Sequence, residues 1–186
     1  MNYPEYFNYL RSRSRLALIY RRLFLYPLLC IYLKDRALDI GCGIGDMLQF
    51  RKNTIGVDIN PNNIAWCQKK GLNAILIDHE KLPFQNGYFS SALMDNVLEH
   101  ITDPMVLLSE VHRVLKDRGR LVVGVPGRLG FKIDQDHKVF YDEATLIHKL
   151  SLTRFSLIKL LHVPFRSSWL DKKLPQYCRY GIFQKI

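Results

Sequence analysis

The stretch Ala37-Leu38-Asp39-Ile40-Gly41-Cys42-Gly43-Ile44-Gly45 decides the fold, together with the pair Val57-Asp58 further along the chain. The pattern predicts a buried strand that ends in a glycine loop, then a short helix, then a second strand that ends on a carboxylate. Glycines let the backbone come close to a ligand, and the acid can accept hydrogen bonds from both hydroxyls of a ribose. We therefore expect the carboxyl ends of an open parallel sheet to hold a nucleoside. The G-x-G-x-G spacing brings the third glycine one place earlier than the dinucleotide fingerprint does, so a pyrophosphate fits poorly.

Four motifs follow one another along the middle of the chain. They are D-I-G-C-G-x-G at Asp39–Gly45, V-D-I at Val57–Ile59, D-x-x-x-L-P-F at Asp78–Phe84 and V-L-E-H at Val97–His100. With these motifs the chain resembles the class I S-adenosylmethionine (SAM) dependent methyltransferases, in their branch of small single-domain enzymes. The resemblance runs from about Ala37 to Arg128 and continues more loosely to the C-terminus.

The resemblance implies an α/β fold with a doubly wound, Rossmann-like sheet. Such a sheet has seven strands, mostly parallel with an antiparallel C-terminal edge hairpin, and N-terminal helices precede it. Short apolar runs bounded by turn residues support this alternation of strands and helices. The expected strands are 37–40, 54–57, 74–77, 90–94 and 120–125, with a final hairpin of 155–162 and 177–185. One helix is expected to start at Asn60-Pro61 and stop at Gly71, and another to run from Asp103-Pro104 through Leu115 to near Gly119.

Length and cysteine usage limit the class of protein. A chain of 186 residues suits one domain, and we expect a helical segment over residues 1–36 that packs on a methyltransferase domain over 37–186. The cysteines at 30, 42, 67 and 178 form no C-x-x-C pair, so neither a disulfide framework nor a zinc site is indicated. We expect reduced thiols and a cytoplasmic protein.

The positive charge is unevenly distributed. The net charge of +10 divides into +5 over residues 1–36, −4 over 37–110 and +9 over 111–186. The acidic middle contains the expected cofactor site, so the basic excess lies in the segments expected to face the acceptor. A basic surface favours phosphate-bearing partners or an anionic membrane. A generally basic soluble protein is the alternative.

The N-terminal segment is apolar but short. The run Leu23–Leu33 contains Pro27 and falls well below the roughly 20 residues that a spanning helix needs. No small-residue cleavage site follows it, so it does not resemble a signal peptide. Two alternatives stay open: helices that pack on the sheet, or an interfacial helix whose arginines lie at lipid headgroups.

The resemblance assigns a part of SAM to each strand end. It puts Asp39 beside the amino acid moiety, Asp58 on the ribose hydroxyls, Ile59 against the adenine, and Asp78 on its exocyclic amine. The backbone amide of His79 is expected to donate to the adenine ring, and Asn96 to border the methionine part through its backbone. The expected cofactor-binding residues are Asp39, Gly41, Cys42, Gly43, Gly45, Asp58, Ile59, Asp78, His79, Asn96 and Val97. Cys42 is expected to fill space in the loop, and Asp39 alternatively fixes the loop without touching SAM.

Two histidines are candidate general bases. His100 follows the fourth expected strand, and an ordinary histidine pKa near 6.5 lets it take a proton from a hydroxyl at neutral pH. Alternatively, Glu99-His100 orients the loop as a structural pair. His137 is the second candidate, or it caps the helix expected after Asp142. Because Glu99 and His100 alone do not make a metal site, we expect no metal.

The sequence therefore predicts a SAM-dependent methyltransferase that moves a methyl group to an oxygen or nitrogen and releases S-adenosylhomocysteine. The expected acceptor is a small molecule, a sugar or a lipid-linked intermediate, with or without peripheral contact at the inner face of an anionic membrane. Transfer RNA or another nucleic acid is an alternative acceptor. A SAM-binding partner protein without activity of its own is the alternative from a different functional class.

Overall fold

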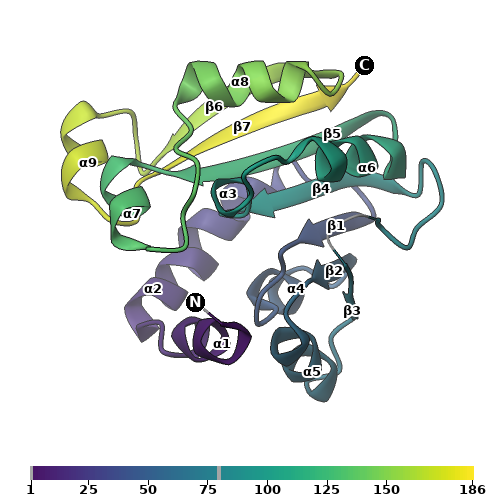
Figure 1. Cartoon of the computed structure of the whole chain (residues 1–186), viewed down its shortest axis with the longest axis horizontal. Helices are drawn as coiled ribbons and strands as arrows, with labels where there is room; N and C mark the ends of the chain where they lie inside the picture. Colours follow the sequence, from purple (N-terminus) through teal and green to yellow (C-terminus); the bar gives the residue numbers. More distant parts are fainter. Residues whose placement is uncertain (1, 79–80) are drawn as a thin grey trace.

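A seven-stranded sheet forms the centre of the computed structural model, which describes residues 2–78 and 81–186 (Figure 1). The strand order is β3-β2-β1-β4-β5-β7-β6, and β1 to β5 run parallel while β7 is antiparallel to β5 and β6. The strands are β1 (Ala37–Ile40), β2 (Thr54–Asp58), β3 (Ala74–Leu76), β4 (Phe89–Asp95), β5 (Leu115–Pro126), β6 (Phe155–Val163) and β7 (Cys178–Lys185). The order reverses at β1 and β4, so ligands are expected at the carboxyl ends of these two strands.

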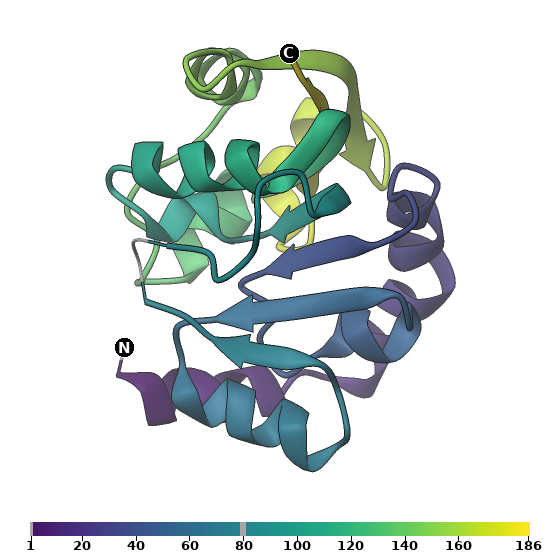
Figure 2. The same ribbon diagram turned by 90° about the vertical axis from the view of Figure 1, so that its right-hand side faces the viewer.

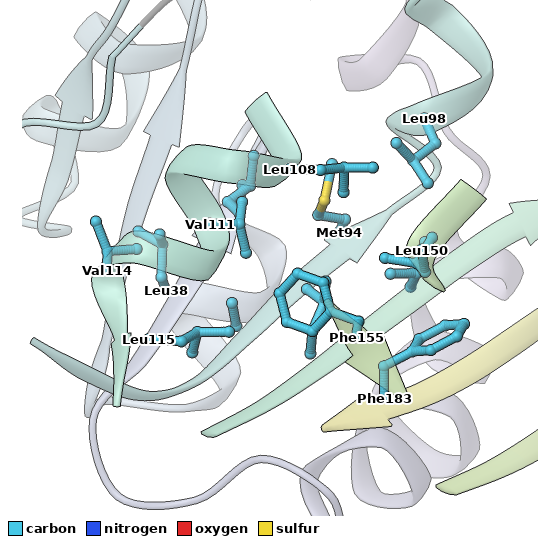
Figure 3. Packing of buried hydrophobic residues seen from close by; sticks show 14 of the residues in the cluster. Leu38, Met94, Leu98, Leu108, Val111, Val114, Leu115, Leu150, Phe155 and Phe183 are labelled. Atoms are coloured by element: carbon cyan, nitrogen blue, oxygen red, sulfur yellow. The ribbon is translucent and has the colours of Figure 1, made fainter. Parts of the chain in front are cut away.

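Helices cover both faces of the sheet (Figure 2). On one face, α6 (Met105–Val114) and α8 (Glu143–Ser151) pack on Leu38, Met94 and Phe183, with the other side chains that Figure 3 shows. On the other face, α3 (Tyr26–Cys30) packs on Leu93 and Val122. α4 (Asp46–Phe50) links α3 to α5 (Pro61–Lys69) on this face. Its residue Met47 packs in the same cluster as α3, and its residue Leu48 packs with Ile64 and Cys67 of α5. Successive residues of β4 and β5 enter opposite layers, which explains the unbroken apolar runs 92–94 of β4 and 121–123 of β5.

The N-terminal helices form a bent arm. α1 (Tyr3–Arg11) begins with a capping box in which Asn2 and Glu5 satisfy each other's backbone amides. α2 (Arg15–Tyr20) begins at Ser14, whose side chain accepts from the Ala17 amide, and one π-helical turn, η1 (Arg21–Leu25), joins it to α3. None of the helices in the two described ranges is long and apolar enough to cross a bilayer.

The architecture confirms the predicted fold, including the N-terminal helices and the edge hairpin. The largest boundary differences adjoin one another: α6 ends at Val114 rather than near Gly119, and β5 begins at Leu115 rather than at Arg120. Leu115 is extended, buried and paired with Phe89, so burial of this side chain on the sheet overrides the helical pattern. Short helices not expected from the sequence are η2 (Leu98–His100), α7 (Arg128–Ile133) and α9 (Ser168–Lys173).

Candidate cofactor and acceptor site

A cavity of about 590 Å³ opens at the carboxyl ends of β1, β2 and β4. Its size falls within the usual range for small-molecule sites. The glycine loop after β1 forms one side, and Gly41 adopts a φ of +68° there. A Cβ atom on Gly41 would lie 2.5 Å from Cγ2 of Val97 in the loop after β4, so only glycine lets these two loops approach. The sequence therefore brings two strand-end loops together across the point where strand order reverses.

Asp58 fixes the glycine loop from the end of β2. Its carboxylate accepts hydrogen bonds from the amides of Gly43 (2.8 Å) and Asn60 (2.8 Å) and from the side chain of Asn63 (3.3 Å). Burial raises the pKa of Asp58, and the donated hydrogen bonds oppose that rise. A carboxylate has about four acceptor positions. Asp58 thus holds the loop, and because it also lines the cavity, its carboxylate lies within reach of a ligand hydroxyl.

Asp39 and Asp95 bring two acidic side chains to the floor of the cavity. Asp39 is buried at the end of β1, and burial together with the nearby Asp95 raises its pKa well above the ordinary value. Asp95 accepts hydrogen bonds from Arg21 of η1 and from the hydroxyl of Tyr180 (2.8 Å). Since Asp95 already has a cation, Asp39 is the carboxyl that a ligand ammonium group would ionise.

The loops after β3 and β4 complete the expected cofactor wall. Asp78 lines the cavity and accepts from the Lys81 amide (3.1 Å). Asn96 has a φ of +58°, and its amide donates to the Gly124 carbonyl (3.0 Å), which turns the chain towards the cavity. Ile59 and Val97 line the same space.

Most predicted cofactor residues line this one cavity. They are Asp39, Gly41, Cys42, Gly43, Asp58, Ile59, Asp78, Asn96 and Val97. Gly45 instead starts α4, and a Cβ there would lie 2.9 Å from the sulfur of Cys67. His79 lies outside the described residues. A hydrogen bond with Cys67, followed by burial, raises the pKa of Cys42, so it remains a thiol.

The N-terminal arm supplies lining residues that the sequence analysis did not assign to the site. Tyr3, Tyr6 and Leu10 of α1 line the cavity, and the Asn60 side chain donates to the Tyr3 carbonyl (2.9 Å). Arg13 and Arg21 line it as well. The spacing of the α1 residues is that of one helix face, which is a signal in the sequence. No local signal links Arg21 to Asp95.

The two candidate bases are neighbours, but only one of them lines the cavity. His100 lines it, and its pKa is lowered by burial and by the neighbouring His137. The two rings are 4.7 Å apart, and Nδ1–H of His137 donates to the Phe131 carbonyl (3.0 Å). Nε2 of His137 lies 3.7 Å from the carboxyl of Glu99 and 3.8 Å from that of Asp134. His137 thus packs against the His100 ring without lining the cavity itself.

Glu99, His100 and His137 form a cluster that could hold a cation. Their potential ligand atoms lie within 4.8 Å of one another. Glu99 is fully buried, no donor among the described residues reaches its carboxyl oxygens within hydrogen-bond distance, and burial raises its pKa. The fold therefore adds His137 as a third potential ligand to the pair Glu99-His100, which sequence spacing alone does not reveal.

Comparison with known proteins identifies the family. Residues 38–123 match the family model described as a methyltransferase domain. The matched region is a domain of the class I SAM-dependent methyltransferases. Membership implies SAM as cofactor, and the acidic, glycine-rich wall fits a ligand with an ammonium group and a ribose.

The methyltransferase fold extends over the whole chain. A SAM-dependent methyltransferase of Thermotoga maritima, described as a possible histamine N-methyltransferase, superposes with a TM-score of 0.76 at 21% identity over 97% of this chain and 98% of that one. A SAM-dependent methyltransferase of Archaeoglobus fulgidus superposes with a TM-score of 0.68 at 23% identity, over 92% of this chain and 100% of that one. At these identities the likeness shows the fold alone.

Sequence similarity to curated proteins covers less. An uncharacterised protein of Methanocaldococcus jannaschii is 33% identical over 119 residues, which cover 61% of this chain and 58% of that protein. The chain spans about half the length of the curated relatives it matches.

Proposed function

We propose that this methyltransferase transfers the SAM methyl group to an oxygen or nitrogen of a small-molecule, sugar or lipid-linked acceptor. The observation that carries the proposal is one cavity lined by Asp39, Asp58 and Asp78 together with His100. The first three match the polar groups of a nucleoside-linked amino acid. The histidine lines the same cavity and can accept a proton from an acceptor hydroxyl bound there.

In the proposed complex, each strand end holds one part of the cofactor. Asp58 accepts from a ribose hydroxyl, Asp39 in its ionised form meets the ammonium group, and Asp78 with Ile59 borders the adenine. SAM supplies a methyl carbon on a sulfonium, whose C–S bond breaks as the acceptor bond forms, leaving S-adenosylhomocysteine. The residues catalyse mainly by alignment and by excluding water.

His100 is the proposed base when the acceptor carries a proton. Its lowered pKa keeps the imidazole neutral at pH 7, so a ring nitrogen can take the hydroxyl proton as the new bond forms. His137, which lies behind His100, is the alternative base. We propose that neither histidine needs a metal. Activity should then survive treatment with EDTA, and loss of activity that zinc or magnesium restores would instead assign the Glu99, His100 and His137 cluster to a cation.

The acceptor class is proposed from the distribution of charge. The basic excess over residues 1–36 and 111–186 favours an acceptor with phosphate groups. A sugar or lipid-linked intermediate at the cytoplasmic face of a membrane fits this charge. Transfer RNA fits the charge as well and is the alternative acceptor.

Calorimetry with SAM tests the core of the proposal. We expect saturable binding that Asp58→Ala abolishes and that Asp117→Ala, a change at a fully exposed carboxylate, leaves intact. Absence of binding by the wild-type chain would refute the proposal. Normal binding without turnover of an acceptor that a related enzyme accepts would favour the partner-protein alternative.

A further inference from the structure

The outer face of the N-terminal arm is apolar where a surface helix is normally polar. α2, η1 and α3 form one continuous helix, drawn in purple in Figure 1. Its inner face buries Leu25, Tyr26 and Leu29 against the sheet. The outward-facing apolar side chains are Leu16, Ile19, Leu23, Phe24 and Ile31, which are 78, 51, 65, 66 and 68% exposed. We call these five residues the outer stripe.

The outer stripe follows the helical repeat. Successive members are separated by three, four, one and seven residues, so they project from one side of the helix. Burial on the sheet cannot explain them, because the inner face of the same helix already provides that packing. A contiguous exposed apolar patch of this kind usually marks a surface that contacts another molecule.

Positive charge accompanies the outer stripe. The exposed charged side chains of the helix itself are Arg15 and Arg22, and Lys34 follows its end next to the acidic Asp35. Arg11 and Arg36 are also exposed, but their guanidinium groups lie over the rings of Trp66 and Tyr88. A second copy of the chain would place these cations against one another. An anionic bilayer instead accepts apolar side chains below its headgroups and cations at them.

We propose that the outer stripe binds the surface of an anionic lipid bilayer, with the arginines at the headgroups. The same continuous helix contributes Arg21 and Tyr26 to the wall of the cavity. Membrane contact therefore brings this part of the cavity close to the lipid. Delivery of a lipid-linked acceptor from that surface rests on the proposed function, whereas the membrane contact itself does not.

Flotation with lipid vesicles tests the apolar part of the proposal. The full chain is mixed with vesicles of phosphatidylcholine containing phosphatidylglycerol, or of phosphatidylcholine alone, and the bound fraction is measured. We expect binding to the anionic vesicles, and a drop of about tenfold in the partition coefficient for Leu23→Ser. The matched control is Leu152→Ser, which removes a 54% exposed leucine at the end of α8, on the opposite face of the sheet, and should bind like wild type.

A second set of variants tests whether cations beside the outer stripe contribute more to vesicle binding than cations elsewhere on the protein. Arg15→Gln with Arg22→Gln should lower binding by at least tenfold, since each cation near an anionic surface contributes about 1 kcal/mol. Lys172→Gln with Lys173→Gln removes the same charge from α9 and should change binding by less than threefold.

Three results would overturn the proposal. They are no binding to anionic vesicles, equal losses for Leu23→Ser and Leu152→Ser, and a dimer in sedimentation velocity that Leu23→Ser dissociates. The last result would assign the outer stripe to a second copy. Calorimetry with SAM on the same variants keeps this test separate from the proposed function, because Leu23→Ser should bind SAM normally whether or not lipid binding is lost.

Discussion

The two sides of the cavity are built in different ways. The cofactor wall consists of the loops after β1, β2 and β3 and of Asn96 and Val97 after β4, and its carboxylates lie within two residues of a strand end. The cap consists of α1, η1, η2 and residues 134–138. It meets the wall through contacts between distant parts of the chain, such as Arg21 with Asp95 and Tyr3 with Asn60. The residues of the wall are therefore positioned by local backbone geometry, whereas those of the cap are positioned by tertiary packing, in particular of the N-terminal arm.

Asp58→Asn should break the wall and leave the cap intact. The amide cannot accept from the Gly43 amide and a ribose hydroxyl as the carboxylate does, so about two charge-assisted hydrogen bonds are lost. We expect the Kd for SAM to rise about a thousandfold in calorimetry. Asp117→Asn is the control, and a Kd for Asp58→Asn within threefold of wild type would contradict this role.

His100→Ala should break the cap and leave the wall intact. With a hydroxyl acceptor, kcat should fall about a hundredfold, while the Kd for SAM stays within twofold of wild type. In the wild type, kcat should decrease as the pH falls through the lowered pKa of His100, because the protonated ring cannot act as a base. His148→Ala, at an exposed position of α8, controls for loss of a histidine. An unchanged pH profile in His100→Ala would transfer the role to another group.

Arg21→Ala should weaken the junction between wall and cap. It leaves Asp95 half-satisfied beneath Asp39, and we expect the free energy of unfolding to fall by about 2 kcal/mol, less than for a fully buried pair because Arg21 is partly exposed. The adjacent exposed Arg22→Ala should change it by less than about 0.5 kcal/mol. Urea unfolding measures both, and equal effects would mean that the arm packs without this ion pair.

The pH dependence of SAM binding should sharpen the role of Asp39. Its raised pKa means that the protonated form is favoured in the free protein, whereas a ligand ammonium group favours the ionised form. Affinity should therefore weaken as the pH falls through the pKa of Asp39, by at most tenfold per pH unit. The same shift makes the free protein lose stability as the pH rises from the ordinary aspartate pKa to the raised one. Asp39→Asn should flatten the binding profile and raise the Tm at pH 7 without SAM.

The cofactor wall could be predicted from the sequence more fully than the cap. The glycine loop, Asp58 and Asn96 could be placed because strand, loop and acid lie within a few residues of one another. The end of α6 could not, because the pairing of Leu115 with Phe89 decides it. The link between Arg21 and Asp95 spans 74 residues and leaves no local pattern. His137 was predicted as a base, but only the fold shows that it lies behind His100 and beside Glu99.

α1 lies over the glycine loop and rests on α5. The Asn60 side chain holds its first turn, while Phe7 and Arg11 lie against the ring of Trp66. Each of these contacts contributes on the order of 1 kcal/mol, and Leu10 is buried beside Gly43. Because α1 lines the cavity, we expect its movement to affect exchange of spent for fresh cofactor. The pace of turnover is therefore expected to depend on residues far from the transferred methyl group.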